Sequence, residues 1–317
     1  MKMVYMGTPE FACPALEVLA ASDHDLLAVV TGPDKPSGRG RKLQACQAKA
    51  AALKLGAPVY HPESLRDNSF IEQMAALEAD VFIVIAFRIL PKKLYTIPAV
   101  GSINIHGSLL PKYRGAAPIN HALLNGETET GLTSFFLSRK VDQGSIIDRV
   151  ATPIEPDENF SSLSARLSDM AGPFLLKTLE LIARPGFTPE IQDDRRATPA
   201  PKIKPEDALI DWHKPVDQVH NHIRAYSRRP GAYTFLNDLK IKILGSTQND
   251  TAGPVALIPG LLKVQDKKLY VGTGNRPLCL TSLQPEGKRQ MDACAFVNGY
   301  RIGETHTFNH SRKEVNS

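Results

Sequence analysis

The sequence has little that would tie it to a membrane. Its longest apolar run near the predicted strands, residues 81–87, is far shorter than the roughly 20 apolar residues that cross a bilayer. The N-terminal segment also lacks the long apolar stretch of a signal peptide. These absences lead us to expect a soluble, cytoplasmic protein.

Cysteine is sparse, and its four residues are scattered: Cys13, Cys46, Cys279 and Cys294. No C-x-x-C pair is present, and no His and Cys residues have the spacing of a zinc site. We therefore predict four reduced thiols and no metal. The G-x-S-x-G of a serine nucleophile, the G-x-G-x-x-G of a dinucleotide site and any internal repeat are also missing.

The net charge of +5 over 317 residues is unevenly distributed. From Lys214 onward, 15 Lys and Arg stand against 8 Asp and Glu, whereas residues 1–213 hold 23 against 25. A basic C-terminal third on a near-neutral body suggests that this third binds an acidic partner. The same charge could serve only to keep the surface soluble, and the count does not decide between the two.

Short apolar runs alternate with helix-length segments through the first half of the chain. Five runs are mainly apolar, and most of them end at or beside Gly or Pro, as buried parallel strands do: residues 3–7, 26–32, 57–62, 80–87 and 101–108. Ala, Leu, Glu and Lys dominate three segments between them, which favours helix: residues 14–22, 44–56 and 69–79. This alternation predicts an α/β fold with an open, doubly wound, mainly parallel sheet. Two further strands, 132–138 and 145–154, and a helix over 161–184 complete it.

Beyond that helix, Pro and charged residues replace the regular pattern. We predict a first domain over residues 1–188, a linker over 189–211 and a second domain over 212–317. Apolar residues at helical spacing over 216–226 predict that the second domain opens with a helix. Short strands with Asn-Asp, Gln-Asp and Gly turns follow, and they predict a small β-barrel of OB-like type.

Asn104 and His106 stand two residues apart at the end of the fifth predicted strand. Residues at this spacing share a face of a strand, so both side chains are expected where an open α/β sheet binds its ligands. An amide N–H beside an imidazole suits a carbonyl oxygen that gains negative charge. The same pair could instead cap nearby backbone, because most buried polar groups are simply satisfied ones.

The stretch NIHGSLLPKYRGAAPI, residues 104–119, resembles the Asn-x-His signature of folate-dependent formyltransferases, which continues into Ser-Leu-Leu-Pro. In that family a later aspartate lies in a loop of the form hydrophobic-Asp-x-Gly, and VDQG supplies it as Asp142. Further similar stretches run from MGTPEFACPALEVL through TGPDKPSGRGRKLQ and APKIKPEDALIDW to LQPEGKRQM. The chain is identified on this basis as a member of that family.

The resemblance implies formyl transfer from 10-formyltetrahydrofolate, a co-substrate, to an amine, without a metal. Within the family the chain looks like the members that act on the α-amine of methionyl initiator tRNA. An amine attacks directly, so no covalent Ser or Cys is needed. By the resemblance, Asn104 and a protonated His106 would stabilise the oxyanion. Asp142 would hold His106, favour its charged form and accept the proton of the amine.

The resemblance also implies where the folate lies. The residues assigned to it are Ser108, Leu109, Leu110, Pro111, Ile89 and Leu90. The segment AFRILPKK departs from the Ala-Tyr-Gly form of many relatives, because it is one residue shorter and carries Arg88. Arg88 either takes part in this pocket or is a solvated surface charge.

The stretch KPSGRGRK, residues 35–42, packs four basic residues around two glycines and resembles the basic insertion loop of the family. Lys and Arg neutralise phosphates and Gly lets the backbone approach closely, although this composition also suits a disordered loop. The resemblance implies tRNA contacts for Arg39, Arg41, Lys42, Lys202 and Lys204. Phe11 matches a position associated with the methionine side chain, and it could equally be a core aromatic.

Two other functions stay open. A formyltransferase for another amine, such as glycinamide ribonucleotide or an amino sugar nucleotide, would keep the same three catalytic residues. The basic loop and basic C-terminal domain argue against it, because a small substrate needs neither. A non-enzymatic tRNA-binding protein with a decayed transferase fold is the third possibility, against which the intact Asn104, His106 and Asp142 argue. We expect a monomer.

Overall fold

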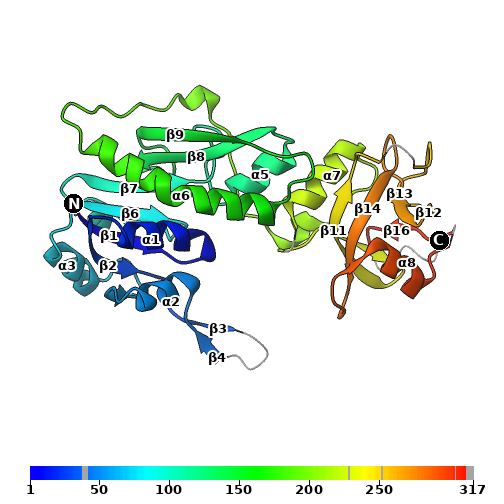
Figure 1. Cartoon of the computed structure of the whole chain (residues 1–317), viewed down its shortest axis with the longest axis horizontal. Coiled ribbons are helices and arrows are strands. Elements are labelled where there is room, and N and C mark those ends of the chain that lie inside the picture. The colour runs from blue at the N-terminus through cyan, green and yellow to red at the C-terminus, as the bar shows by residue number, and fades with distance from the viewer. Residues whose placement is uncertain (38–41, 228, 251–252, 304, 312–317) are drawn as a thin grey trace. The chain divides into compact units, whose positions relative to one another are not determined.

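The computed structural model describes residues 1–37, 42–227, 229–250, 253–303 and 305–311. The backbone of these residues packs into two compact units, and most of their helices and strands are labelled in Figure 1. The first unit comprises Met1–Pro118, Thr130–Thr152 and Ser164–Ala200. The second comprises Ile119–Glu129, Pro153–Leu163 and the chain from Pro201 onward.

A seven-stranded sheet in the order β5-β2-β1-β6-β7-β8-β9 organises the first unit. Its strands are β1 (Lys2–Gly7), β2 (Asp25–Val30), β5 (Val59–Tyr60), β6 (Val81–Ile85), β7 (Gly101–His106), β8 (Glu129–Phe136) and β9 (Ile146–Pro153). The first five in this order pair in parallel, and β8 pairs antiparallel with β7. The predicted open, mainly parallel sheet is confirmed.

The chain order reverses at the centre of this sheet. From β1 the chain passes outward through β2 to β5, and it then returns to β6 on the other side of β1. In an open α/β sheet, ligands bind beyond the carboxyl ends of the strands near such a reversal. Strand β7, which carries the candidate catalytic pair, lies next to β6 and ends at that edge.

Helices cover the sheet of the first unit. They are α1 (Cys13–Ala20), α2 (Gln47–Lys54), α3 (Asn68–Ala76), α4 (Lys92–Tyr95) and most of α6 (Phe160–Ile182), with a 3-10 turn η1 at Glu10–Ala12. Phe70 and Met74 of α3 join Val4 and Phe82 of the sheet in one apolar cluster. Strand periodicity sends the neighbours of Val4 and Phe82 to the opposite face, so the sheet is apolar on both sides, as a covered parallel sheet requires.

The second unit contains an antiparallel sheet of order β12-β13-β14-β11-β10-β16, with β15 paired to β14. The strands are β10 (Tyr233–Leu236), β11 (Leu239–Thr247), β12 (Leu262–Gln265), β13 (Lys268–Val271), β14 (Leu278–Pro285), β15 (Met291–Asp292) and β16 (Phe308–Asn309). A bridge between Leu261 and Thr307 joins the chain before β12 to the chain before β16. The Leu262 backbone N–H donates to the His306 carbonyl there, at 2.9 Å. The sheet therefore closes on itself, as the predicted small barrel requires.

Trp212 anchors the core of the second unit. Its ring stacks on Phe308 at 5.7 Å, and its indole N–H donates to the Thr234 hydroxyl at 3.0 Å. The side chain is 1% exposed, and apolar residues of the barrel and of helix α7 (Val216–Ala225) surround it. The helix predicted over 216–226 is confirmed, and its apolar spacing explains why it packs here.

Several short elements were not predicted. The described ends of the basic loop pair as the strands β3 (Lys35–Ser37) and β4 (Lys42–Gln44). Helices α5 (Pro118–Leu124) and α8 (Ala293–Tyr300) and the 3-10 turns η2 (Asp194–Arg196) and η3 (Pro205–Ala208) complete the structure. They are too short to be recognised from the periodicity of apolar residues. Helix α8 has an N-cap, because the Asp292 carboxylate accepts from the Ala295 N–H at 2.7 Å.

None of the described helices has the length and apolar character needed to cross a membrane. All four cysteines are free in the structure, and Cys279 is buried.

We expect Trp212→Ala to lower the free energy of unfolding by about 3–5 kcal/mol, because it empties a large buried site and removes the indole N–H that donates to the Thr234 hydroxyl. Urea unfolding followed by circular dichroism measures the change. Val255→Ala is the matched control: its side chain is 97% exposed, so a change within about 0.5 kcal/mol is expected. Equal stability of the two variants would contradict this account of the core.

Candidate active site

Asn104 and His106 lie on one face of β7, at its carboxyl end. The register places Asn104 beside Val84 of β6 and Phe135 of β8, and His106 beside Thr133. His106 is 7% exposed and Asn104 is partly exposed. No hydrogen bond joins the Asn104 amide to another of the described residues, so its N–H groups are available to a ligand.

The imidazole of His106 is held by a backbone carbonyl. Its Nε2 lies 2.8 Å from the carbonyl oxygen of Tyr113, and its Nδ1 lies 3.8 Å from Oδ2 of Asp142. A carbonyl oxygen can only accept, so Nε2 carries the hydrogen and the neutral ring presents a bare Nδ1 toward the carboxylate.

Asp142 reaches this position through a constrained turn. Its φ of 53° lies in the left-handed region, which aspartate tolerates better than most residues. One carboxylate oxygen accepts from the Gly115 backbone N–H at 2.8 Å. Gly144 completes the turn, and a Cβ there would lie 1.6 Å from the Phe136 carbonyl oxygen. The D-x-G pattern thus has a steric cause, since only glycine allows this backbone approach.

Some of the residues that were predicted to bind folate are buried in the core, and others lie at the surface. Ser108 is fully buried, and its hydroxyl donates to the Lys112 carbonyl at 2.7 Å. Leu110, Pro111 and Leu90 are buried, Leu109 is half-buried, and Ile89 is 78% exposed. The structure therefore uses most of these side chains for packing, and their role toward folate stays a prediction.

The guanidinium of Arg88 binds backbone carbonyls of a neighbouring loop. Its guanidinium donates to the Glu63 carbonyl at 3.0 Å and the Pro62 carbonyl at 2.8 Å. It also lies 5.3 Å from the centre of the Phe87 ring, and burial lowers its pKa. Arg88 thus joins the loop after β6 to the loop after β5.

The residues assigned to tRNA and methionine are placed in part. Lys202 and Lys204 are exposed, and Phe11 lies half-buried in η1, with its carbonyl accepting from Ser168. Lys42 begins β4, whereas Arg39 and Arg41 lie outside the described residues.

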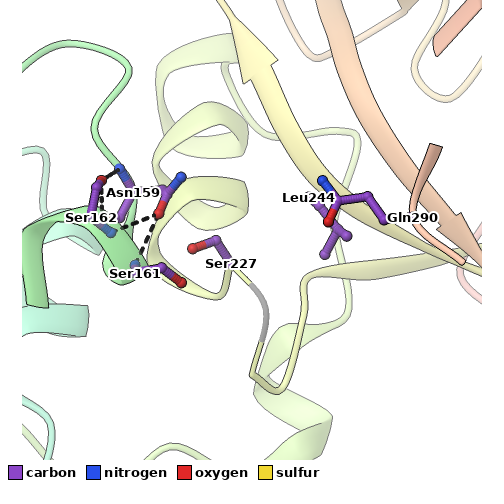
Figure 2. Close-up of a pocket in the computed structure, with 6 residues that line it drawn as sticks. All are labelled: Asn159, Ser161, Ser162, Ser227, Leu244 and Gln290. Atoms are coloured by element: carbon purple, nitrogen blue, oxygen red, sulfur yellow. Dashed lines mark hydrogen bonds between the residues drawn. The ribbon is translucent and has the colours of Figure 1, made fainter. Parts of the chain in front are cut away.

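A polar pocket of about 350 Å³ lies in the second unit. Figure 2 shows Ser227 between the start of α6 on one side and Leu244 and Gln290 on the other. Asn159 caps the helix, since its side-chain oxygen accepts from the Ser161 and Ser162 N–H groups at 2.9 and 3.2 Å. The lining side chains are neutral, so the pocket provides no charge to bind an anion or a cation.

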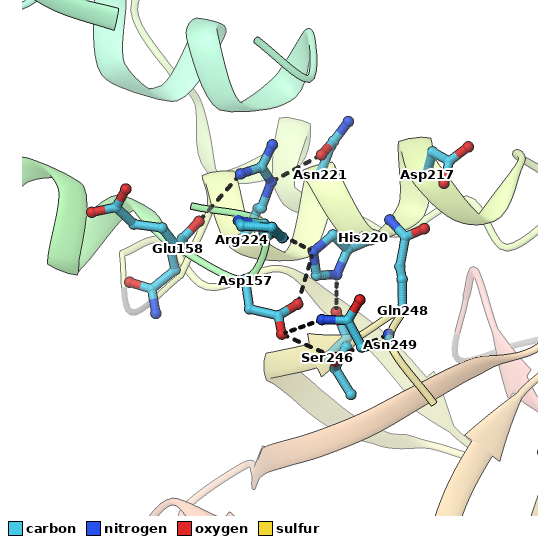
Figure 3. Close-up of polar contacts among 12 residues, drawn as sticks. Asp157, Glu158, Asp217, His220, Asn221, Arg224, Ser246, Gln248 and Asn249 are labelled. Atoms are coloured by element: carbon cyan, nitrogen blue, oxygen red, sulfur yellow. Dashed lines mark hydrogen bonds and ion pairs between the residues drawn. The ribbon is translucent and has the colours of Figure 1, made fainter. Parts of the chain in front are cut away.

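A histidine of the second unit joins three separate segments (Figure 3). His220 donates from Nε2 to the Pro156 carbonyl at 3.1 Å, and its Nδ1 accepts from the Ser246 hydroxyl at 2.9 Å. Asp157 lies 3.6 Å from the ring and accepts from the Thr247 hydroxyl at 3.0 Å. Burial lowers the pKa of His220, and the two partners of its neutral ring fit that form. The cluster ties the chain before α6 to α7 and β11.

Among the residues that the structure describes, no group of three or more His, Cys, Asp and Glu side chains is placed to hold a metal ion. The three residues of the candidate active site are an amide, an imidazole and a carboxylate. Together they can polarise a carbonyl and move a proton without a covalent intermediate.

Comparison with known proteins identifies this arrangement. Residues 1–179 match the family described as Formyl transferase, and residues 202–301 match the one described as Formyl transferase, C-terminal domain. The chain therefore belongs to the formyl transferase family. Curated relatives carry a more specific name: the methionyl-tRNA formyltransferase of Trichlorobacter lovleyi is 42% identical over 303 residues, which is 95% of each chain. That of Moorella thermoacetica is 40% identical over 95% of this chain and 96% of its own.

Solved structures with lower identity share the fold. The N-formyltransferase from Helicobacter canadensis, in complex with folinic acid and dTDP-3-aminofucose, has a TM-score of 0.68 at 20% identity. It covers 88% of this chain and 98% of its own. HypX from Aquifex aeolicus, in complex with tetrahydrofolic acid, has a TM-score of 0.65 at 16% identity and covers 96% of this chain and 48% of its own. At these identities the likeness shows the fold alone.

We expect Gly144→Ala to destabilise the protein by about 1–3 kcal/mol and to displace Asp142, because the added Cβ overlaps the Phe136 carbonyl. Urea unfolding measures the stability change. Gly299→Ala, at an exposed helical position where a Cβ meets nothing within 4 Å, is expected to stabilise instead, by about 0.5–1 kcal/mol. A stable Gly144→Ala protein would show that the turn does not need glycine.

The stability of the protein should also depend on His222. Burial, with the positive charge of Lys214 adding to it, lowers its pKa from 6.5 to about 4. The unfolded chain therefore binds the extra proton first, and stability falls as the pH drops from about 6.5 to about 4, by on the order of 3 kcal/mol from this group. Above that window its contribution is fully present.

His222→Gln should flatten this part of the pH dependence, measured as unfolding free energy between pH 7 and pH 4. The exposed His61 serves as control, and His61→Gln should follow the wild-type curve. A His222→Gln curve parallel to wild type would rule out the buried ring as a source of acid sensitivity.

Proposed function

We propose that the protein transfers the formyl group of 10-formyltetrahydrofolate to the α-amino group of methionyl initiator tRNA, giving N-formylmethionyl-tRNA. One observation carries the proposal: Asn104, His106 and Asp142 converge at the carboxyl end of β7. The similarity to relatives named methionyl-tRNA formyltransferase, over 95% of the chain, supports the choice of acceptor.

In the proposed reaction the neutral amine attacks the formyl carbon, and the formyl oxygen becomes an oxyanion. The amide of Asn104 donates to that oxygen. Because the Tyr113 carbonyl occupies Nε2 of His106, the other ring nitrogen, Nδ1, is the one left to donate. The 3.8 Å between Nδ1 and the nearer oxygen of Asp142 is too long for a hydrogen bond, so the carboxylate faces this nitrogen without being bonded to it.

The proton of the attacking amine needs an acceptor. An α-amino group has an ordinary pKa of about 7.7–8.0, so a useful neutral fraction is present at physiological pH. After attack, Asp142 accepts the proton of the new ammonium, directly or through water. This proton passes to the folate nitrogen as the C–N bond to that nitrogen breaks and the oxyanion reforms the carbonyl. No covalent enzyme intermediate is required, because the nucleophile belongs to the substrate.

We further propose the division of labour along the chain. Residues 1–188 carry catalysis, 189–211 form the linker, and 212–317 bind tRNA. The folate lies along Ser108–Pro111, beside Ile89 and Leu90, and the exposed Lys202 and Lys204 contact the tRNA backbone with Arg39, Arg41 and Lys42. Phe11 contacts the methionine side chain. The protein acts as a cytoplasmic monomer.

Formyl transfer should be measured from 10-formyltetrahydrofolate to methionyl initiator tRNA, beside glycinamide ribonucleotide and free methionine as acceptors. Product is expected on the tRNA alone. Asn104→Ala and His106→Ala should each lower turnover at least about 100-fold, as the loss of one oxyanion donor does elsewhere. The exposed His61→Ala variant should keep wild-type turnover.

Formylation of the small amine instead would retain the chemistry and overturn the acceptor. No product on any acceptor, with tRNA binding retained, would support a binding protein. Wild-type turnover of a folded His106→Ala variant would remove His106 from the mechanism.

A further inference from the structure

Gln192 holds the turn that carries Asp142. Its side chain belongs to a residue that is 8% exposed, and it comes from the segment predicted to be a linker. Its Nε2 donates to the Asp142 carbonyl at 3.0 Å and to the Gly144 carbonyl at 2.8 Å. A single amide group therefore satisfies the backbone at both ends of the turn.

The other end of the same amide fixes its orientation. Its Oε1 accepts from Arg114, at 3.0 Å from Nε and 2.8 Å from Nη2. A guanidinium only donates, so the amide oxygen must face Arg114 and the NH₂ must face the two carbonyls. Both hydrogens of the amide and both lone pairs of its oxygen are used, which leaves one orientation that satisfies every group.

Arg114 stands between the two supports of the active site. Its neighbour Tyr113 provides the carbonyl that holds His106, and its other neighbour Gly115 provides the N–H that holds the Asp142 carboxylate. The same segment as Gln192 secures this stretch again, because the Thr198 hydroxyl accepts from the Tyr113 N–H at 2.9 Å. The Thr198 carbonyl also accepts from the Arg114 N–H at 2.9 Å.

We propose that Gln192, through its clamp with Arg114, is a positioning residue for the His106–Asp142 pair, so that the segment after α6 completes the catalytic site. The inference rests on the proposed function. The side chain of Gln192 contacts two backbone carbonyls and Arg114, so it acts through the turn, and the left-handed backbone at Asp142 would relax without these contacts. A displacement of a catalytic group by about 1 Å can lower the rate about 100-fold. Loss of the Gln192 contacts should therefore lower kcat and leave substrate binding unchanged.

Gln192→Glu tests this directly. The glutamate keeps the shape and the acceptor for Arg114, while an oxygen replaces the NH₂ that faces two carbonyl oxygens. We expect kcat for methionyl-tRNA to fall about 10- to 100-fold, with KM for tRNA and for 10-formyltetrahydrofolate within about twofold of wild type. The pH–rate profile of kcat should also shift, because the spacing of imidazole and carboxylate changes.

The neighbouring Asp193 provides a matched control. Its carboxylate pairs with exposed Arg195 and makes no contact with the catalytic turn, so Asp193→Asn should keep the wild-type kcat and pH profile. Circular dichroism melting shows whether Gln192→Glu is folded. If it is not, Arg114→Lys replaces it, because a lysine keeps the charge and loses the fork that fixes the amide.

The outcomes separate the two proposals. No product from the wild-type protein refutes the proposed function itself. An active wild type with a folded variant of unchanged kcat and pH profile overturns the role of Gln192, as does a rise in KM at constant kcat. A fall in kcat with a shifted pH profile, absent in Asp193→Asn, is the result that the clamp predicts.

Discussion

The geometry of the active site depends on one hydrogen bond between two loops, from the Gly115 backbone N–H to the Asp142 carboxylate at 2.8 Å. The first loop follows β7 and holds the imidazole of His106 through a carbonyl, and the second follows β8 and carries the carboxylate. Because β7 and β8 run antiparallel, the two loops leave opposite ends of the strand pair, and the second loop must fold back to bring the carboxylate to 3.8 Å from the imidazole.

Close backbone packing gives these loops their precision. A Cβ at Gly144 would overlap the Phe136 carbonyl, and one at Gly115, whose φ is +133°, would lie 2.4 Å from the Ala200 carbonyl oxygen. Each glycine thus lets one chain segment lie directly against another, and interiors packed at this density resist displacement. The segment that ends at Ala200 belongs to this packing, although its Pro-rich and charged sequence is typical of a free linker.

Only those site residues that lie in a local sequence pattern or in a motif of the family could be predicted from the sequence. The resemblance pointed to Asn104, His106 and Asp142, and the structure brings the last two together. It also assigned Ser108 and Leu90 to the folate pocket. In the structure the Ser108 hydroxyl donates to the Lys112 carbonyl, and Leu90 packs in an apolar cluster. Gln192 was missed, because its partners lie 48 to 78 residues away and nothing in its neighbourhood marks it.

The sequence by itself determined the alternation of strands and helices, the shared face of Asn104 and His106, and the four separate thiols. These follow from periodicity and spacing, which are properties of neighbouring residues. Only the tertiary structure decided which ring nitrogen of His106 is free, that Asp142 adopts a left-handed turn, and that Gln192 holds it. Such features depend on contacts between segments far apart in the chain, and the packing of the whole unit sets them rather than any local pattern.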